Sequence, residues 1–348
     1  MISISLCMIV KNEEQVLARC LDSVAPLMDE LIIVDTGSTD RTREIAAQYT
    51  DRIYDFDWCD DFAAARNYAF SLASMDYIYA PDADEYLDPV NQERFLILKE
   101  ALLPEIEIVQ MRYVTPTDYN TVQNCKHELR PKLFKRLRTF TWVDPVHETI
   151  RTEPVIYDSD IEIMHLPHSL HCKRDFTLFE KAFHRDGSLS EKVASMYAKE
   201  LFKCGEYPDF LASEDFFLQN YEQTASPEAA SVLAHIARLK NDTDSFFSIC
   251  LKDMAGDSCS EICYELGYYY MSRRNYREAS LWFYNAVYET EAVLDIEIPG
   301  QKALLALADC YQNMAEQCDP ESYEHDRLLE DASDCRMRAE NWQLPEEL

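Results

Sequence analysis

The chain has 348 residues, enough for two domains, and its 47% hydrophobic content is sufficient for ordinary buried cores. It carries 64 acidic residues against 33 lysines and arginines, and this net charge of −31 makes it a poor match to nucleic-acid phosphates or to an anionic membrane surface. Any phosphate site must therefore be local, built from a few basic groups or a divalent cation.

The 12 cysteines form no CxxC pair and no zinc framework. Most have apolar or helical neighbours, where a free cysteine behaves as a small hydrophobic residue, so we expect a reducing, cytoplasmic location. The apolar run at residues 2–10 is too short to span a bilayer and lacks the basic start and cleavage site of a signal peptide. No other segment of the sequence resembles a transmembrane helix.

The first 50 residues alternate between strand and helix patterns. Residues 2–10 are rich in β-branched side chains and predict a strand, after which Asn12 is placed to cap a helix over residues 16–24. A second buried strand at residues 31–34 ends at Asp35, and a helix over residues 41–49 follows it.

The alternation continues with a short strand at residues 53–54, a helix around residues 63–69 and an apolar run, residues 77–80, that Pro81 ends. Such an alternation predicts a mostly parallel α/β sheet with right-handed crossovers. Ligands bind such sheets at the carboxyl ends of the strands, where the polar residues after each strand would converge.

Asp82, Asp84 and Glu85 follow the fourth predicted strand directly. Three carboxylates this close repel one another unless a positive group lies between them. Alternate side chains of an extended segment point the same way, so Asp82 and Asp84 would offer hard oxygen ligands for Mg²⁺ or Mn²⁺. The alternative is a solvated acidic turn. The sequence contains neither GxGxxG nor GxxxxGK[ST].

Four segments together resemble the family 2 glycosyltransferases, in the branch that carries C-terminal tetratricopeptide-like helices and includes bacteriocin S-glycosyltransferases and cell-envelope sugar transferases. The matching strings are SLCMIVKNEE (5–14), VDTGSTDRT (34–42), DDFAAARN (60–67) and DADE (82–85). The resemblance implies a nucleotide-sugar-binding domain of the GT-A type and an inverting reaction. It also implies a divalent metal on the Asp-x-Asp carboxylates, with Asp84 the main ligand and Asp82 beside the metal and the ribose.

The same resemblance assigns residues to the nucleotide. Val10, Lys11 and Asn12 would border the base, Asp35 would contact the uracil or ribose, and Arg66 would approach the donor.

Each of these assignments has a structural alternative. Asp35 would then only cap a turn, Arg66 would pair with Asp61, and Asn12 would only cap its helix. Glu85 is open between a site role and a role in holding the loop.

A basic segment at residues 126–138 follows a further predicted strand, residues 106–114. Its string RPKLFK (130–135) resembles the family at this place. The segment is either a solvated face or a contact to the donor diphosphate or the acceptor, and we expect the contact. The sequence does not rank Lys132, Lys135 and Arg136.

Inversion needs a base that takes the acceptor's proton. The candidates are Asp144, His147 and Glu148, in a string after Trp142 that continues the resemblance. Glu148 has the alternative of pairing with the basic segment.

A last strand, residues 161–165, ends in His165. The resemblance implies that this late histidine completes the metal shell, and the alternative is a histidine with a structural role only. Here the family's usual Gly-Tyr is replaced by Leu166 and Pro167, and His168 and His171 follow closely. Which histidine meets the metal therefore stays open.

From about residue 176 the pattern becomes helical throughout, so we expect a GT-A-like domain over residues 1–175 and a helical domain over residues 176–348. Gly267, Ala279, Phe283 and Ala286 match the tetratricopeptide pattern at a helix crossing. The helical half would either stabilise the enzyme or form a homodimer, or hold an acceptor.

The sequence as a whole predicts a metal-dependent inverting glycosyltransferase that uses Mn²⁺ or Mg²⁺ and a nucleotide-sugar donor, with a UDP-sugar favoured. Its acceptor would be a peptide, a protein or a cell-envelope glycan. The alternative is a non-catalytic scaffold with a degenerate transferase domain.

Overall fold

The computed structural model describes residues 1–114, 128–137, 154–166, 172–256 and 258–343, with the backbone alone at 142–143, 149–150 and 172–174. These residues separate into two compact units, an α/β unit that ends at Ala182 and a helical unit that begins at Phe183. The predicted domain boundary after residue 175 falls within the helix α5, Cys172–Asp186.

The first half of the sheet is parallel and follows the predicted strand–helix alternation. Its strands lie in the order β3-β2-β1-β4. Their bounds are Ile4–Val10 for β1, Glu30–Asp35 for β2, Ile53–Asp55 for β3 and Tyr77–Tyr79 for β4. The crossover helices are α1 (Leu17–Val24), α2 (Thr42–Ala46) and α3 (Phe62–Ser71).

The second half of the sheet continues from β4 in the order β7-β6-β10-β5. The strands are β7 (Glu128–Lys135), β6 (Ile108–Val114), β10 (Ile156–His165) and β5 (Glu85–Tyr86). β7 is antiparallel to both its neighbours, β6 and β10 are parallel, and β5 closes the edge antiparallel to β10. A separate short pair joins β8 (Trp142–Val143) to β9 (Thr149–Ile150).

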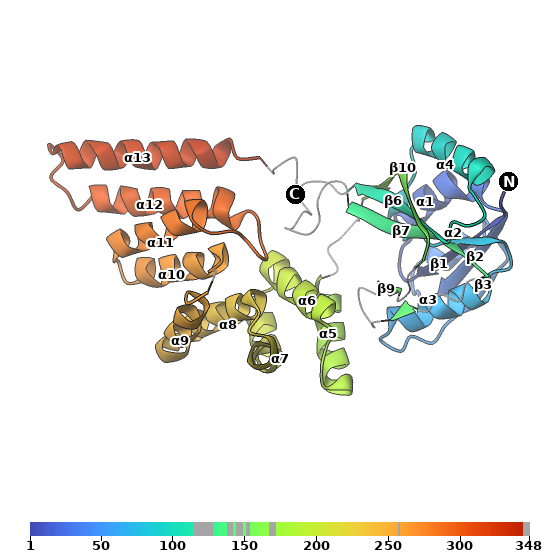
Figure 1. Cartoon of the computed structure of the whole chain (residues 1–348), viewed down its shortest axis with the longest axis horizontal. Coiled ribbons are helices and arrows are strands. Elements are labelled where there is room, and N and C mark those ends of the chain that lie inside the picture. Colours follow the sequence, from blue (N-terminus) through green and yellow to red (C-terminus); the bar gives the residue numbers. More distant parts are fainter. Residues whose placement is uncertain are drawn as a thin grey trace. The chain divides into compact units, whose positions relative to one another are not determined.

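Helices cover both faces of the parallel half (Figure 1). Alternate residues of β1, including Leu6 and Met8, face α1 and α4 (Pro89–Ala101), where Leu21 and Phe95 are fully buried. Cys7 lies on the opposite face and packs with Ala69 of α3. The period-two alternation of β1 thus supplies two cores at once, as expected of a strand covered on both faces.

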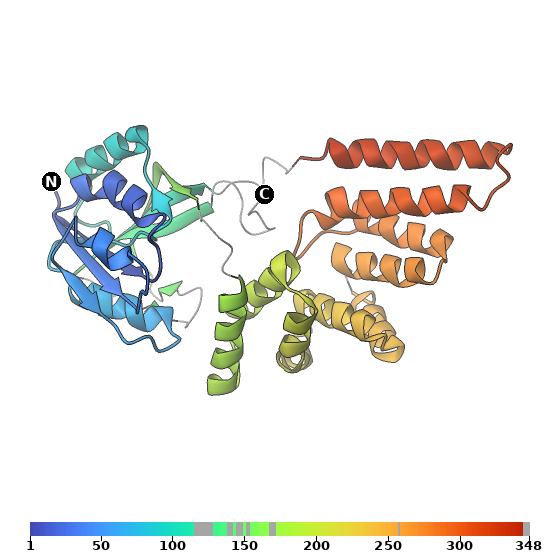
Figure 2. The same cartoon turned by 180° about the vertical axis from the view of Figure 1, so that it is seen from behind.

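The helical unit consists of helices that pack against their neighbours along the chain (Figure 2). They are α6 (Glu191–Cys204), α7 (Tyr207–Thr224), α8 (Pro227–Lys240), α9 (Thr243–Asp253), α10 (Ser260–Ser272), α11 (Tyr276–Tyr288), α12 (Ala303–Ala315) and α13 (Tyr323–Glu340). The predicted architecture, a mostly parallel α/β domain followed by an all-helical half, is therefore confirmed. In the described part of the chain, no helix is both long enough and apolar enough to cross a bilayer.

The predicted helix crossing lies between α10 and α11. A Cβ atom on Gly267 would come within 2.5–2.8 Å of the Phe283 ring, so only glycine allows this close approach without a shift. Ala279 and Ala286 are fully buried on the same helix as Phe283. Small residues here let the two helices approach closely, as in tetratricopeptide pairs.

Two glutamates on α10 are buried for structural reasons. Glu261 accepts hydrogen bonds from the backbone N–H groups of Val293, Leu294 and Asp295 at 2.8–3.1 Å, and so fixes the segment between α11 and α12. Glu265 meets His235 Nδ1 at 2.7 Å and the guanidinium of Arg238, both on α8.

One cysteine departs from the expectation of free thiols. Cys204, at the end of α6, is disulfide-bonded. Cys7, Cys20, Cys250 and Cys263 are among the cysteines that are free and buried, as the sequence predicts for small hydrophobic residues.

Candidate functional site

The predicted convergence of strand ends occurs at one edge of the sheet. β1, β2 and β4 are parallel, and Val10 lies in register with Asp35 at their carboxyl ends. β7 runs the other way beside β4, and the backbone N–H of Ala80 donates to the carbonyl of Lys132 at 2.9 Å. The antiparallel strand thereby brings a lysine beside the acidic loop that follows Ala80.

A bulge in β7 aims Lys132 into this site. Val109 of β6 pairs with Leu133, but the next residue, Gln110, pairs with Pro131, so Lys132 is the extra residue. A bulge re-aims a side chain and increases the local bend of its strand. Pro131 and Leu133, on either side of Lys132, both pair with β6. Lys132 itself has no partner in β6, and its side chain is buried.

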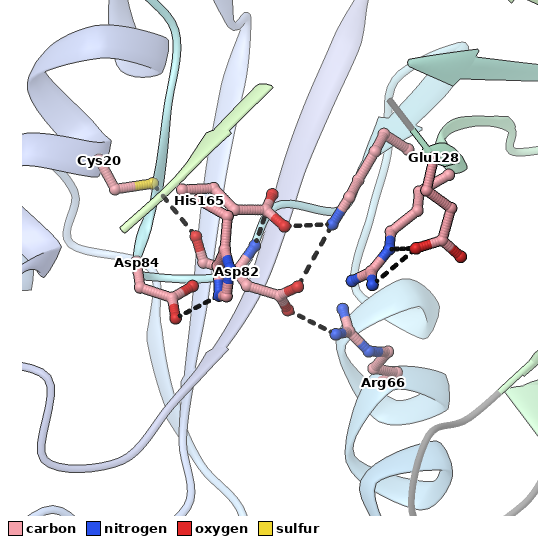
Figure 3. Close-up of polar contacts among 9 residues, drawn as sticks. Cys20, Arg66, Asp82, Asp84, Glu128 and His165 are labelled. Atoms are coloured by element: carbon pink, nitrogen blue, oxygen red, sulfur yellow. Dashed lines mark hydrogen bonds and ion pairs between the residues drawn. The ribbon is translucent and has the colours of Figure 1, made fainter. Parts of the chain in front are cut away.

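Asp82 is bound by two cations (Figure 3). Its carboxylate lies 2.6 Å from Arg66 Nη2 and 3.3 Å from Lys132 Nζ. Burial opposes ionisation, but the positive charges of Lys132 and Arg66 outweigh it and hold the pKa of Asp82 well below its usual range. Arg66 therefore pairs with Asp82 in this structure, and its approach to the donor stays a prediction.

Glu85 holds the acidic loop from within. Its side chain is 1% exposed, accepts from Lys132 Nζ at 2.6 Å and accepts from the backbone N–H of Asp82 at 3.2 Å. Burial, together with the negative charges of Asp82 and Asp84, raises the pKa of Glu85 to about 8 despite the attraction of Lys132. The sequence leaves open whether Glu85 acts in the site or only holds the loop. Its contacts show that it holds the loop and also fixes the side chain of Lys132.

Asp84 is paired with His165, as Figure 3 shows. His165 Nε2 lies 3.0 Å from Asp84 Oδ2, and β5 and β10 hold the pair because Glu85 and His165 are opposite each other in the ladder. The second ring nitrogen, His165 Nδ1, is buried with no hydrogen-bond partner among the described residues. The structure thus brings together two of the three predicted metal ligands.

The donor types of this pair fit a hard divalent cation. Within the described residues no three His, Cys, Asp or Glu side chains gather as a complete metal centre, because the carboxylate of Asp82 is turned to Arg66 and Lys132. Mg²⁺ is usually held by one or two carboxylates while substrate phosphates and water complete its shell. An imidazole nitrogen is more typical of transition metals, so the pair would suit Mn²⁺ better than Mg²⁺. Asp84 and His165 fit such an incomplete shell.

Arg130, the first residue of the string RPKLFK, lies close to the residues of this site, although the sequence does not single it out. Its guanidinium lies over the ring of Tyr113 at 3.8 Å and donates to Glu128. The ring of Tyr113 is also 5.0 Å from that of His165, so the stack links Arg130 to the histidine of the Asp84 pair. The sequence places Arg130 two residues before Lys132, and alternate side chains of an extended segment point the same way.

The residues predicted to border the nucleotide form a hydrogen-bonded loop at the ends of β1 and β2. Asn12 has a left-handed backbone, with φ of 57°, and its Oδ1 accepts from the N–H of Thr39 at 2.8 Å. Asp35 accepts from Ser38 N and Oγ at 3.0 and 2.6 Å and lies 3.6 Å from Arg43.

The expected helix cap at Asn12 is wrong. α1 begins only at Leu17, and the side chain of Asn12 is already bound to Thr39. Lys11 is exposed, with Nζ 5.8 Å from the ring of Trp58 on the adjoining loop, whereas Val10 is buried in β1.

The structure does not bring every predicted residue to this edge. Lys135 pairs with Tyr77 at the start of β4, the opposite end of the strand, and its Nζ donates to the carbonyl of Pro104. Arg136 follows it there and donates to the carbonyl of Met75. The remaining predicted residues lie outside the described part of the chain: Asp144, His147, Glu148, His168 and His171.

Comparisons with known proteins match parts of the chain to glycosyltransferases and to a repeat protein. The model of the family described as Glycosyl transferase family 2 matches residues 5–156. A TPR repeat-containing protein of Synechococcus elongatus is 52% identical over 87 residues, which are 25% of this chain and 22% of that protein. An uncharacterized glycosyltransferase of Rickettsia bellii is 26% identical over 224 residues, 59% of this chain and 69% of that protein.

Among solved structures, a glucosyl-3-phosphoglycerate synthase from Mycobacterium tuberculosis in complex with Mn²⁺, UDP-glucose and phosphoglyceric acid covers 55% of this chain and 82% of its own, with 16% identity and a TM-score of 0.39. The residues matched by the family model include β1, β2, β4, β7 and the acidic loop, whereas His165 at the end of β10 lies beyond them. Residues 5–156, whose described part lies within the α/β unit, thus resemble glycosyl transferase family 2.

Proposed function

We propose that the α/β unit transfers a sugar from a nucleotide-diphosphate sugar, with a UDP-sugar the favoured donor, to an acceptor with inversion at the sugar carbon. The observation that carries the proposal is the gathering of Asp82, Asp84, Arg66, Lys132 and His165 at the carboxyl edge of the sheet of a domain that resembles family 2. An acidic loop beside two buried cations is suited to a ligand that brings both phosphate groups and a divalent ion.

Asp84 and His165 would hold Mn²⁺ or Mg²⁺, which would supply Lewis-acid stabilisation of the charge on the leaving nucleotide diphosphate. Asp82 keeps Arg66 and Lys132 in fixed positions by direct ion pairs. Preorganised cations stabilise charge that develops during a reaction without a reorganisation cost. Arg130, fixed by its stack on Tyr113, would add a third cation to this group.

The nucleoside would lie at the ends of β1 and β2. Asn12 and Asp35 fix the loop between residues 36 and 40, and Lys11 is exposed beside it. The general base would be Glu148, Asp144 or His147, each of which follows the basic strand in sequence.

The acceptor would be a peptide, a protein or a cell-envelope glycan held in part by the helical unit. Stacked helix pairs offer extended surfaces for such ligands.

The test is a thermal-stability measurement with UDP, GDP and CDP, each with and without Mn²⁺. We expect one nucleotide to raise the Tm only with Mn²⁺, because a ligand at 100 times its Kd stabilises the folded state by about 2.7 kcal/mol. Asp84→Ala should keep the ligand-free Tm, lose the Mn²⁺-dependent shift and lose sugar transfer by about a hundredfold or more.

A matched control is Asp51→Ala, which removes an exposed carboxylate from a turn of the same unit. It should behave as wild type in both measurements. Full transfer activity in the Asp84→Ala protein with metal present would contradict the assignment. No response of the wild type to any nucleotide would favour the scaffold alternative.

A further inference from the structure

An arginine outside the acidic loop joins the two chain segments that carry the Asp84–His165 pair. Arg19 Nη2 donates to the backbone carbonyl of Asp84 at 3.1 Å and to that of Leu166 at 2.8 Å. Leu166 directly follows His165, and its own N–H donates to the Asp84 carbonyl at 3.2 Å. The guanidinium of Arg19 therefore bridges the backbone of Asp84 to the backbone of Leu166, the neighbour of His165.

Two further contacts fix this bridge. The guanidinium carbon of Arg19 lies 5.2 Å from the centre of the Tyr86 ring, and Tyr86 pairs with Met164 in the β5–β10 ladder. The next residue of α1, Cys20, is buried, and its Sγ lies 3.5 Å from the carbonyl of Asp82. Consecutive residues of one helix thus hold the backbone of the acidic loop at both aspartates.

We propose that Arg19 is a positioning residue for the metal pair, an inference that rests on the proposed function. It does not act on the substrate. It holds the Asp84 loop and the end of β10 at the separation at which a carboxylate oxygen and an imidazole nitrogen can share one cation. Partners that orient metal ligands from outside the ligand shell typically change metal affinity 10–100-fold when they are removed.

The chain offers a closely matched control in Arg94. This arginine, on α4, donates to the backbone carbonyl of Asp160 at 2.8 Å and to Asn91 Oδ1 at 3.2 Å. Arg94 and Arg19 both fasten a helix to β10 through a guanidinium–carbonyl bond. They differ in that Asp160 lies within the strand, whereas Leu166 adjoins the pair, and in that Arg94 also lies 3.6 Å from the carboxylate of Asp160.

The experiment measures Mn²⁺ binding directly, from the free Mn²⁺ signal in electron paramagnetic resonance, on the full chain without donor and again with UDP. We expect R19A to raise the Kd for Mn²⁺ by about 10-fold or more and R94A to leave it unchanged. UDP without metal should leave the Tm of both variants unchanged, as it should in the wild type. The ligand-free Tm values of R19A and R94A should shift to a similar extent, because each variant loses hydrogen bonds from one exposed or half-exposed guanidinium to a backbone carbonyl.

R19K tests the same point by partial rescue. An ammonium can donate to both carbonyls but lacks the planar fork and the stack on Tyr86, so its Kd should lie between those of wild type and R19A. If R19A does not fold, the comparison of R19K with R94K takes its place.

Two results would overturn the inference alone: an unchanged Mn²⁺ Kd in R19A, or an equal increase in R19A and R94A, which would make both arginines general strand fasteners. A wild type that binds no Mn²⁺ with or without UDP would overturn the proposed metal site, and the role of Arg19 with it. The two failures are thus distinguished by the wild-type titration.

Discussion

The α/β unit and the helical unit each bury a glutamate beside cations, and the two carboxyl groups respond in opposite ways. Glu85 in the α/β unit has its pKa raised to about 8 by burial and by the nearby carboxylates, although Lys132 touches it. Glu265 in the helical unit is equally buried, yet the charges of His235 and Arg238 outweigh burial and lower its pKa to about 2.

The difference lies in how the charges are matched. In the helical unit one carboxylate has two partners of its own, so the cluster is complete within the protein. At the acidic loop Asp82 pairs with Arg66 and Lys132, and Glu85 shares Lys132 with it. The carboxylate of Asp84 pairs with His165. A complete cluster serves the fold, whereas an excess of carboxylates leaves attraction for a cation from outside.

The largest stability effect should come from Lys132→Met. It leaves Glu85 and Asp82 in the protein without the cation between them, and breaking a buried pair from one side costs about 3–5 kcal/mol. Hydrogen exchange resolved by peptide should show the loss in the α/β unit alone. Lys135→Met, on the same strand but bound only to the Pro104 carbonyl among its described contacts, should change little. Equal effects would show that charge matching at the loop is unimportant.

Glu265→Gln should destabilise the helical unit by about 3 kcal/mol, because Arg238 and His235 then face a neutral amide in a buried position. The same exchange measurement, read on α8 and α10, checks it. Glu289→Gln, at the exposed residue that directly follows α11, is the control and should be neutral. A neutral Glu265→Gln would mean that the helical cluster is also incomplete or unimportant.

The Glu265 cluster also predicts an acid response. The unfolded glutamate takes up its proton near pH 4.5 and the folded one near pH 2, so the stabilisation is full above pH 4.5 and is lost as the pH falls through this interval. Between pH 5 and 3 the helical unit should lose about 2 kcal/mol more in wild type than in Glu265→Gln. Parallel pH curves for the two proteins would rule out the lowered pKa.

Gly267→Ala tests packing rather than charge and should have the smallest effect. The added methyl overlaps the Phe283 ring, and overpacking a core costs about 1–3 kcal/mol, of which the better helix propensity of alanine offsets up to about 1 kcal/mol. Thermal unfolding should therefore show a modest loss. Gly256→Ala, whose new methyl would meet only the Asp253 carbonyl at 3.6 Å, should be near neutral. A stabilised Gly267→Ala would show that the crossing has room to spare.

Much of the fold could be predicted from the sequence, because the alternation of apolar strands and amphipathic helices is local. The strand that ends at His165 appears as predicted, and the helical half appears as predicted after residue 176. The acidic loop could also be found, since its spacing and its place after a strand are visible in the chain.

The ranking of the basic residues could not be predicted. Lys132 and Lys135 lie three residues apart on one strand, and only the antiparallel pairing of β7 with β4 decides which of them reaches the strand ends. The bulge that aims Lys132 inward depends on β6, a separate segment of the chain. The role of Arg19 was hidden for the same reason, because both carbonyls that it binds are distant in sequence.

These long separations in sequence determine when the contacts of the site can form during synthesis of the chain. Asp84 and His165 are 81 positions apart, and Arg19 reaches Leu166 across 147 positions. A nascent chain that has emerged only as far as β7 can already form the Asp82 ion pairs, because Arg66 and Lys132 precede that point. It still lacks the imidazole, so the pair proposed for the metal assembles only when translation of the α/β unit is nearly complete.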